Sequence, residues 1–132
     1  GQLANLATRA FVGSGDNVLI PGLVISGAAP RRVLVRAVGP GLAAFGVAGT
    51  LADPVLTVFR GSSAIATNDN WQEQANGAAV ATAGVETGAF ALAAGSRDSA
   101  LVLTLEPGAY TCRVAGAGSS TGVALVEVYL LP

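Results

Sequence analysis

The sequence predicts an all-β fold, namely a jelly-roll-like β-sandwich of about eight to ten short antiparallel strands with at most one or two short helical turns. Short runs rich in β-branched and aliphatic residues recur along the chain, and clusters of Gly, Pro, Asn, Asp and Ser separate them at regular spacing. This pattern is typical of sandwiches and barrels. The length of 132 residues suits one hydrophobic core, so we expect a single domain over residues 1–132.

The first half of the chain alternates short strands with turn signals. The expected strands are residues 11–12, 18–20, 24–26 and 33–35. Segment 13–17 separates the first two of them and segment 27–30 the last two. Both segments are rich in the residues that favour tight turns, so we interpret each as a hairpin connection.

The second half repeats the pattern. Residues 55–59 and 64–67 flank a Gly-Ser-Ser turn signal, and residues 101–105 run into Pro107-Gly108. Because proline fixes φ and glycine supplies the positive φ that follows, a tight turn is expected there. The last two expected strands are residues 109–114 and 123–129, joined by the glycine- and serine-rich segment 115–120.

Two segments do not resemble strands. Residues 39–46, Gly-Pro-Gly-Leu-Ala-Ala-Phe-Gly, contain too much glycine for a strand and predict a packed loop that could hold one helical turn. Residues 72–85 are rich in alanine and glutamine. They could form a short helix or an irregular crossover between sheets, and both alternatives stay open.

The composition excludes several kinds of chemistry. Apolar residues make up 52% of the chain and charged residues only 11%, the net charge is −1, and there is no His, Lys or Met. Without His or Lys there is no imidazole base, no Schiff-base amine and no His-ligated metal. We therefore expect no enzyme. The absence of a basic run argues against nucleic-acid binding, and no stretch is long and apolar enough for membrane insertion.

The outer faces of several strands are unusually apolar. Alternation places Val33, Val35 and Ala37 toward the core, with Arg36 and the apolar Leu34 on the opposite face. A strand that is apolar on both sides needs cover on both sides. Loops or a second subunit could provide it, and because so few charges are available we favour a partner, namely another copy of the chain.

Both ends of the chain also point to self-association. The sequence is extended from its first residues and ends on strand with no polar tail, so an end strand could join the sheet edge of a neighbour. Tight trimming around an isolated domain is the alternative. The residues expected at an assembly interface are Leu3, Leu6, Phe11, Tyr129, Leu130 and Leu131.

A calcium site is the first candidate ligand site. Asn68, Asp69 and Asn70 are consecutive and could supply oxygen ligands, with help from Asp53 or Asp16. The spacing lacks the alternating acidic pattern of a calcium loop, and Asx side chains in turns usually bond their own backbone. No other cofactor is expected.

Four further residues are singled out by type and position. Trp71, the only tryptophan, could stack on a sugar, although a lone Trp beside a turn is more often a packing anchor. Arg36 and Glu127 lie in otherwise apolar strands and predict a structural ion pair. Cys112 has no partner for a disulfide and no His or Lys to activate it, so we expect a buried structural thiol.

Two family resemblances complete these expectations. Segments 53–61, 65–70 and 107–116, in the second half of the chain, resemble the bacterial pre-peptidase C-terminal domain, a secreted β-sandwich appended to exported enzymes. The whole chain more closely resembles an uncharacterised tandem repeat of large exported bacterial surface proteins, through Leu-Ala-Asn-Leu-Ala-Thr-Arg near its start, Gly-Asp-Asn-Val-Leu-Ile, Arg-Ala-Val-Gly-Pro and the final Gly-Val-Ala-Leu-Val-Glu-Val-Tyr. Both resemblances imply an exported, non-catalytic module.

The expected function is therefore a structural subunit or repeat of an extracellular filament or cell-surface assembly that self-associates through its end strands and apolar outer faces. The alternative is a secreted carbohydrate- or calcium-binding module attached to an exported enzyme. Either function places the protein outside the cell or on its surface, and Gly1 in the place of Met agrees with removal of an export signal.

Overall fold

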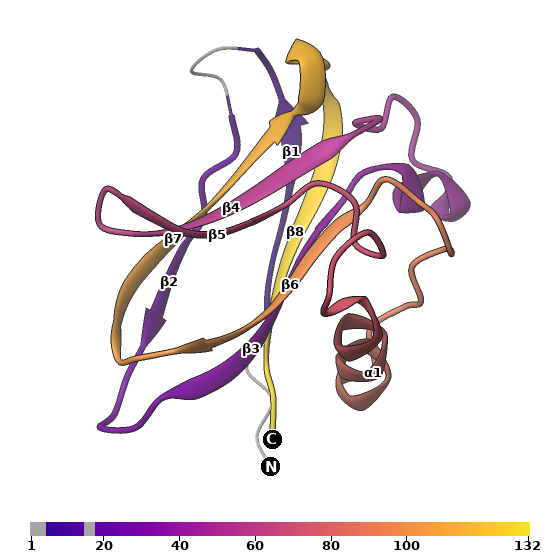
Figure 1. Ribbon diagram of the computed structural model, residues 1–132. Coiled ribbons are helices and arrows are strands. Elements are labelled where there is room, and N and C mark those ends of the chain that lie inside the picture. The colour runs from indigo at the N-terminus through magenta and orange to yellow at the C-terminus, as the bar shows by residue number, and fades with distance from the viewer. Residues whose placement is uncertain (1–4, 15–17) are drawn as a thin grey trace.

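The computed structural model describes residues 5–14 and 18–132, and in this part of the chain eight strands form two antiparallel sheets that face each other (Figure 1). Sheet A has the order β1-β8-β3-β6 and sheet B the order β2-β7-β4-β5. The strands are β1 (Asn5–Val12), β2 (Gly22–Ile25), β3 (Arg31–Val38), β4 (Pro54–Arg60), β5 (Ser63–Asn68), β6 (Ser99–Leu105), β7 (Gly108–Gly116) and β8 (Gly122–Leu130).

The strand order is that of a jelly roll. β1 pairs with β8, β2 with β7, β3 with β6 and β4 with β5, as if one long hairpin had been wrapped into two facing sheets. The predicted fold class is thus confirmed.

The two predicted hairpins were wrong. Segment 27–30 joins strands of different sheets, as does the connection between β1 and β2 that contains residues 13–17. Residues 18–20 form only a bridge, through Leu19 to Val114. Turn residues specify that the chain reverses, but they do not specify which strand it then pairs with. Among the described strands only β4 and β5 are consecutive and paired, around Gly61 with its φ of +61°.

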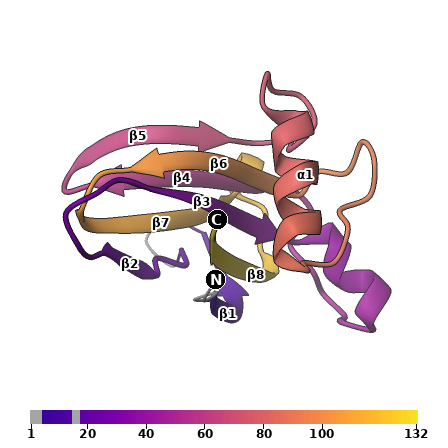
Figure 2. The ribbon, with the colours of Figure 1, turned by 90° about the horizontal axis from the view of Figure 1, so that it is seen from below.

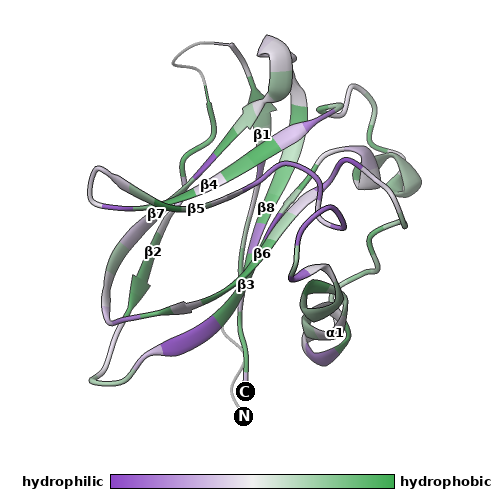
Figure 3. Ribbon diagram, viewed as in Figure 1, coloured by the Kyte–Doolittle hydropathy of each residue, from purple (hydrophilic) through white to green (hydrophobic). Residues whose placement is uncertain are grey.

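The main hydrophobic core lies between the two sheets. Val33, Val35 and Ala37 face it, as their alternation predicted, and all three have no exposed surface. Apolar residues run through most of each strand, whereas polar residues gather at the start of β3 and in the segment that leads to α1 (Gly77–Thr87) (Figure 3). The core therefore follows from the strand pattern.

A second cluster covers the outer face of sheet A. Leu34, Ala100 and Tyr129 on that face pack against Val80 and Ala83 of α1. The expected partner is not needed here, because a helix of the same chain supplies the cover (Figure 2). The preference for a second subunit over this face was wrong, and the cover comes from a helix where the alternative had named loops.

Helices form in both segments whose structure the sequence left open, residues 39–46 and 72–85. Residues 72–85 contain most of α1, which is eleven residues long and so longer than the helical turns expected from the sequence. Alanine favours the helix, and Gly88, with φ +75°, ends it in a left-handed conformation. Segment 39–46 holds the short 3-10 helix η1 (Pro40–Phe45), and a second one, η2 (Ala117–Ser119), precedes β8. No helix in residues 5–14 and 18–132 is long and apolar enough to cross a membrane.

Candidate functional site

At one edge of the sandwich, hydrogen bonds from the end of β5 and the residues before α1 and β6 link the two sheets. We call the residues that make these bonds, Asn68, Trp71, Gln74 and Asp98, the clasp. Asn68, at the end of β5, accepts a hydrogen bond on Oδ1 from the backbone N–H of Ala100 in β6, and its amide nitrogen donates to the carbonyl oxygen of Asn70. Asn68 is buried, and both polar ends of its side chain are satisfied inside the protein. It is therefore a structural residue of the clasp.

Trp71 anchors the same clasp. Its side chain is only 5% exposed, its indole N–H donates to the carbonyl oxygen of Ala93 at 3.1 Å, and it packs in the second cluster. It offers no open platform for a sugar, so the stacking hypothesis is corrected and the packing alternative is right. Gln74, which the sequence did not single out, braces this position by donating to the carbonyl oxygens of Trp71 and Ala100, each at 2.8 Å.

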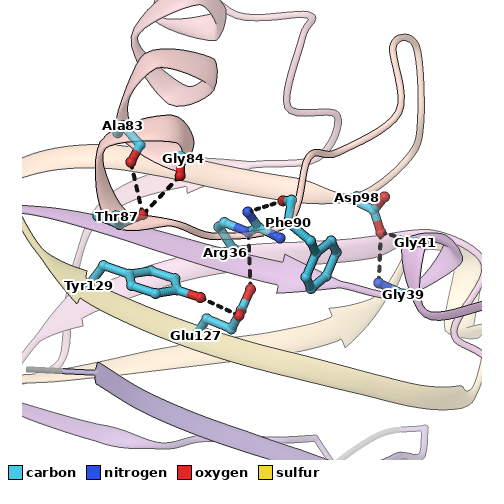
Figure 4. Close-up of polar contacts among 10 residues, drawn as sticks. All are labelled: Arg36, Gly39, Gly41, Ala83, Gly84, Thr87, Phe90, Asp98, Glu127 and Tyr129. Carbon is cyan, nitrogen blue, oxygen red and sulfur yellow. Dashed lines mark hydrogen bonds and ion pairs between the residues drawn. The ribbon is translucent and has the colours of Figure 1, made fainter. Parts of the chain in front are cut away.

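Asp98 holds the clasp to the end of β3 and was also missed from sequence. Its side chain is fully buried, and Oδ1 accepts from the backbone N–H groups of Gly39 and Gly41 at 2.8 and 3.1 Å (Figure 4). Ser96 donates its hydroxyl to Oδ2 at 2.8 Å. The glycines permit this approach, because a Cβ on Gly41 would lie 3.1 Å from Oδ2. Asp98 is saturated by internal donors.

A pair of carboxylates lies beside the clasp. Asp53 precedes β4 and Asp69 follows β5, and since these strands pair antiparallel the two side chains meet. Burial, and then the hydrogen bond and charge of Asp69, raise the pKa of Asp53 from 3.8 to about 6, against the opposing charge of Arg97. Arg97 is only a loose partner, with Nη1 4.0 Å from Oδ2 of Asp53.

This carboxylate pair is the part of the structure whose donor set best suits a hard cation. Oδ1 of Asp53 and Oδ1 of Asn70 are both buried and accept no hydrogen bond. Carboxylate and amide oxygens are the ligands that Ca²⁺ prefers. Within the described ranges no three acidic or Cys side chains converge as a metal site, so amide and backbone oxygens would have to complete it. Asp16, the other suggested ligand, lies outside the described residues.

The predicted pair of Arg36 and Glu127 is present beneath α1. Nε of Arg36 lies 3.1 Å from Oε1 of Glu127, both side chains are almost fully buried, and Tyr129 donates its hydroxyl to Oε2 (Figure 4). The Nε and Oε1 atoms are at ion-pair distance but are not aligned as a hydrogen bond, and both lack a hydrogen-bonded partner. Burial and the neighbouring Glu127 raise the pKa of Tyr129 to about 12. The pair is structural.

Cys112 is a buried thiol, as expected. It lies in the core between the sheets with no exposed surface. Burial raises the pKa of the thiol to about 11, which keeps it protonated and poorly nucleophilic near neutral pH.

The expected assembly residues divide into two groups. Leu6 and Phe11 on β1 are 39% and 66% exposed. Tyr129 and Leu131 are buried in the second cluster and are not available on the surface, whereas Leu130 is half-buried and packs against the main core. Tyr129 and Leu131 are corrected for the same reason as Leu34, because they pack in the cluster that contains Val80 and Ala83 of α1. Leu3 lies outside the described residues.

One edge of the sandwich is nevertheless open and apolar. β1 and β2 are the terminal strands of sheets A and B and run along the same side of the molecule, opposite β5 and β6 (Figure 2). Val24 in β2 and Ile20, which precedes β2, are 71% and 53% exposed. We call Leu6, Phe11, Ile20 and Val24 the open edge. Ile20 and Val24 were missed because the sequence does not show which strands are terminal.

The fold defines the chain as a jelly-roll β-sandwich, and a comparison with solved structures agrees. The pre-peptidase C-terminal domain of a collagenase from Bacillus anthracis matches with a TM-score of 0.55 over 94% of this chain and 88% of that one, at 10% sequence identity. The similarity to this class of domain thus concerns the fold, and it extends well beyond the second half in which the sequence resemblance lay. No model of a protein family and no curated protein matches the chain.

Proposed function

We propose that the chain is a non-catalytic structural module of an exported or cell-surface protein and that it associates with other copies of itself through the open edge. The observation that carries this proposal is the contrast between the two edges of the sandwich. At one edge the clasp bonds Asn68 of β5 to Ala100 of β6. At the other, large apolar side chains are exposed on β1 (Leu6 and Phe11), on β2 (Val24) and just before β2 (Ile20).

An unprotected edge is an unusual feature. Natural sheets usually block their edges with charged side chains, proline, bulges or covering elements, because unpaired N–H and C=O groups recruit another strand. β1 has eight residues and a single charge, Arg9, and β2 has none. Added apolar contacts would strengthen main-chain pairing with a second copy. The low charge of the whole chain supports the same role.

The position of the module in a larger protein is part of the proposal. The similar solved structure is itself a C-terminal domain of a collagenase, which fits an accessory module attached to an exported protein. Asn5 pairs with Tyr129, so the chain enters and leaves the sandwich at the same end. A tandem array would therefore connect neighbouring copies through one end of each and leave the open edge accessible along its side.

Sedimentation velocity over a range of protein concentrations tests the association. We expect the wild-type protein to form larger species as the concentration rises, and Phe11→Lys to remain monomeric because it places a charge on the edge. Val85→Lys is the matched control: Val85 is 83% exposed on α1, away from the edge, so this variant should behave like wild type. A wild-type monomer at every concentration would overturn the proposal.

The geometry of association has two alternatives that electron microscopy distinguishes. Two β1 strands that pair with each other form a closed dimer, whereas β1 pairing with a different edge of the next copy produces a filament. From the sequence we expect the filament. Regular fibres would support it, and discrete particles of two copies would restrict self-association to a dimer.

Calcium binding is the second candidate function, and the unsatisfied oxygens of Asp53 and Asn70 favour it. A cation there would relieve the repulsion between Asp53 and Asp69. Calorimetric titration with CaCl₂ should then show one site in the wild-type protein and none in Asp69→Asn, while Glu106→Gln, which changes an exposed carboxylate elsewhere, should bind like wild type. The absence of heat in the wild-type protein would exclude this function.

A further inference from the structure

A pocket of about 160 Å³ lies between α1, the segment that follows it and the outer face of sheet A. Its wall is mainly apolar and includes Trp71, Val80, Phe90 and Leu92. Val85, which also lines it, is 83% exposed, so the pocket opens to solvent. A cavity of about 150 Å³ lined by apolar side chains is large enough to hold a benzene molecule. The pocket is therefore large enough for a small hydrocarbon group.

The one charged side chain in the wall is Arg36. Its side chain is 2% exposed, Nη1 donates to the carbonyl oxygen of Phe90 at 2.7 Å, and the guanidinium lies 4.4 Å from the centre of the Phe90 ring. Nη2 is buried without a hydrogen-bond acceptor among the residues that the structure describes. A buried guanidinium with an unused donor is costly unless an acceptor satisfies it.

Gly84 on α1 gives the pocket its access to this guanidinium. A Cβ on Gly84 would lie 3.9 Å from Nη1 of Arg36, and apart from its chain neighbours and the backbone of its own helix it would meet nothing else within 4 Å. A larger side chain at this position would extend over the charged group and into the pocket. Glycine in the middle of a helix costs about 1 kcal/mol of stability relative to alanine. A ligand that occupies the space over Arg36 would explain why α1 has glycine at this position.

We propose that this pocket binds a small carboxylate with a hydrocarbon body, whose apolar part fills the space beside Trp71 and whose oxygens accept hydrogen bonds from Arg36. The volume sets the size of the body at about six carbon atoms. A carboxylate is the acceptor whose geometry best matches a guanidinium. A free short-chain acid and the carboxyl-terminal residue of a peptide share this chemistry. The inference goes beyond the proposed structural function and does not depend on it.

The only tryptophan of the chain lies in the wall of the pocket and reports on binding directly. Titration with hexanoate should produce a saturable change in Trp71 fluorescence. 1-Hexanol, which has the same hydrocarbon body without the charge, should bind at least about tenfold more weakly, because charge-assisted hydrogen bonds are lost. N-acetyl-leucine presents the carboxylate on a peptide-like body, and its affinity relative to hexanoate distinguishes the two sources.

Two variants of α1 make the test specific to the pocket. Gly84→Leu replaces glycine with a good helix former and fills the space over Arg36, so hexanoate should no longer bind. Ala78→Leu adds the same side chain at an exposed position of the helix outside the pocket and should bind like wild type. The proposal is overturned if hexanoate gives no saturable signal, if hexanol binds equally well, or if Gly84→Leu binds hexanoate with unchanged affinity.

Discussion

Arg36 on β3 and Glu127 on β8 stand directly opposite each other, and Nε of the first lies 3.1 Å from Oε1 of the second beneath α1. Removing one member of such a buried pair leaves an uncompensated charge in the interior. We therefore expect Glu127→Ala to lower the free energy of unfolding by about 3 to 5 kcal/mol, as measured by chemical denaturation. Glu106→Ala, at an exposed carboxylate, should change it by less than about 0.5 kcal/mol.

The double variant Arg36→Leu with Glu127→Leu refines this prediction. Apolar replacement of a whole buried pair is often neutral or stabilising, although here Tyr129 loses the acceptor of its hydroxyl. The double variant should therefore be more stable than Glu127→Ala alone. If the double variant is less stable than Glu127→Ala, then the two side chains stabilise the fold by more than cancelling each other's buried charge.

Asp98 is expected to matter through hydrogen bonds to the backbone. Asp98→Ala leaves the N–H groups of Gly39 and Gly41 without their acceptor, and each unsatisfied buried donor costs about 1 to 3 kcal/mol. Denaturation should show a loss of about 3 kcal/mol or more. Ser96→Ala removes one bond to the Asp98 carboxylate and a long bond from the backbone N–H of Asp98, and leaves the bonds to Gly39 and Gly41 in place, so it should cost about 1 kcal/mol. Equal losses in the two variants would contradict this account.

The stability of the fold should fall with rising pH around Asp53. The pKa of Asp53 is about 6 in the folded protein against 3.8 as its usual value, so the folded state binds the proton more tightly. The contribution of protonated Asp53 to the stability of the fold is fully present below about pH 3.8 and is lost as the pH rises through about 6.

Asp53→Asn tests this directly. In a chelator, to keep cations away, the variant should be more stable than wild type at pH 7.5, and this advantage should disappear at pH 4. Denaturation curves at the two pH values measure it, with Glu106→Gln as a control that should show no such difference. An advantage of the same size at both pH values would rule out the titration of Asp53 as the cause.

Cys112 should be unreactive until the protein unfolds. It has no exposed surface, and its pKa is about 11, so the native thiol is both inaccessible and protonated. A chromogenic disulfide reagent at pH 8 should label the native protein only at the rate of unfolding and should label the denatured protein at once. Rapid labelling of the native protein would contradict the burial.

The sequence predicted well what strand alternation controls. Val33, Val35 and Ala37 face the core as expected, because period-two alternation fixes the side of a sheet on which a residue lies. The pairing of Arg36 with Glu127 was also predictable, since two isolated charges in apolar strands need each other. These features depend on local pattern and on the chemistry of single residues.

The predictions that failed concern features that depend on which distant segments of the chain pack together. The cover of Leu34 and Tyr129 by α1 could not be inferred, because an apolar strand face gives no information on what packs against it. The hairpin interpretation of segments 13–17 and 27–30 failed for the same reason. The proximity of Asp53 and Asp69 could not be predicted either, because it depends on the pairing of β4 with β5. The role of Gly84 could not be predicted because it depends on Arg36, which is distant in sequence and lies beneath it in the fold.

Amide hydrogen exchange, measured as a function of protein concentration, tests whether copies of the chain associate through the open edge. Association by strand pairing should slow the exchange of amides in β1 at high concentration and leave α1 unchanged, and Phe11→Lys should abolish the slowing. Exchange in β1 that is the same at every concentration, in wild type and variant alike, would contradict the account.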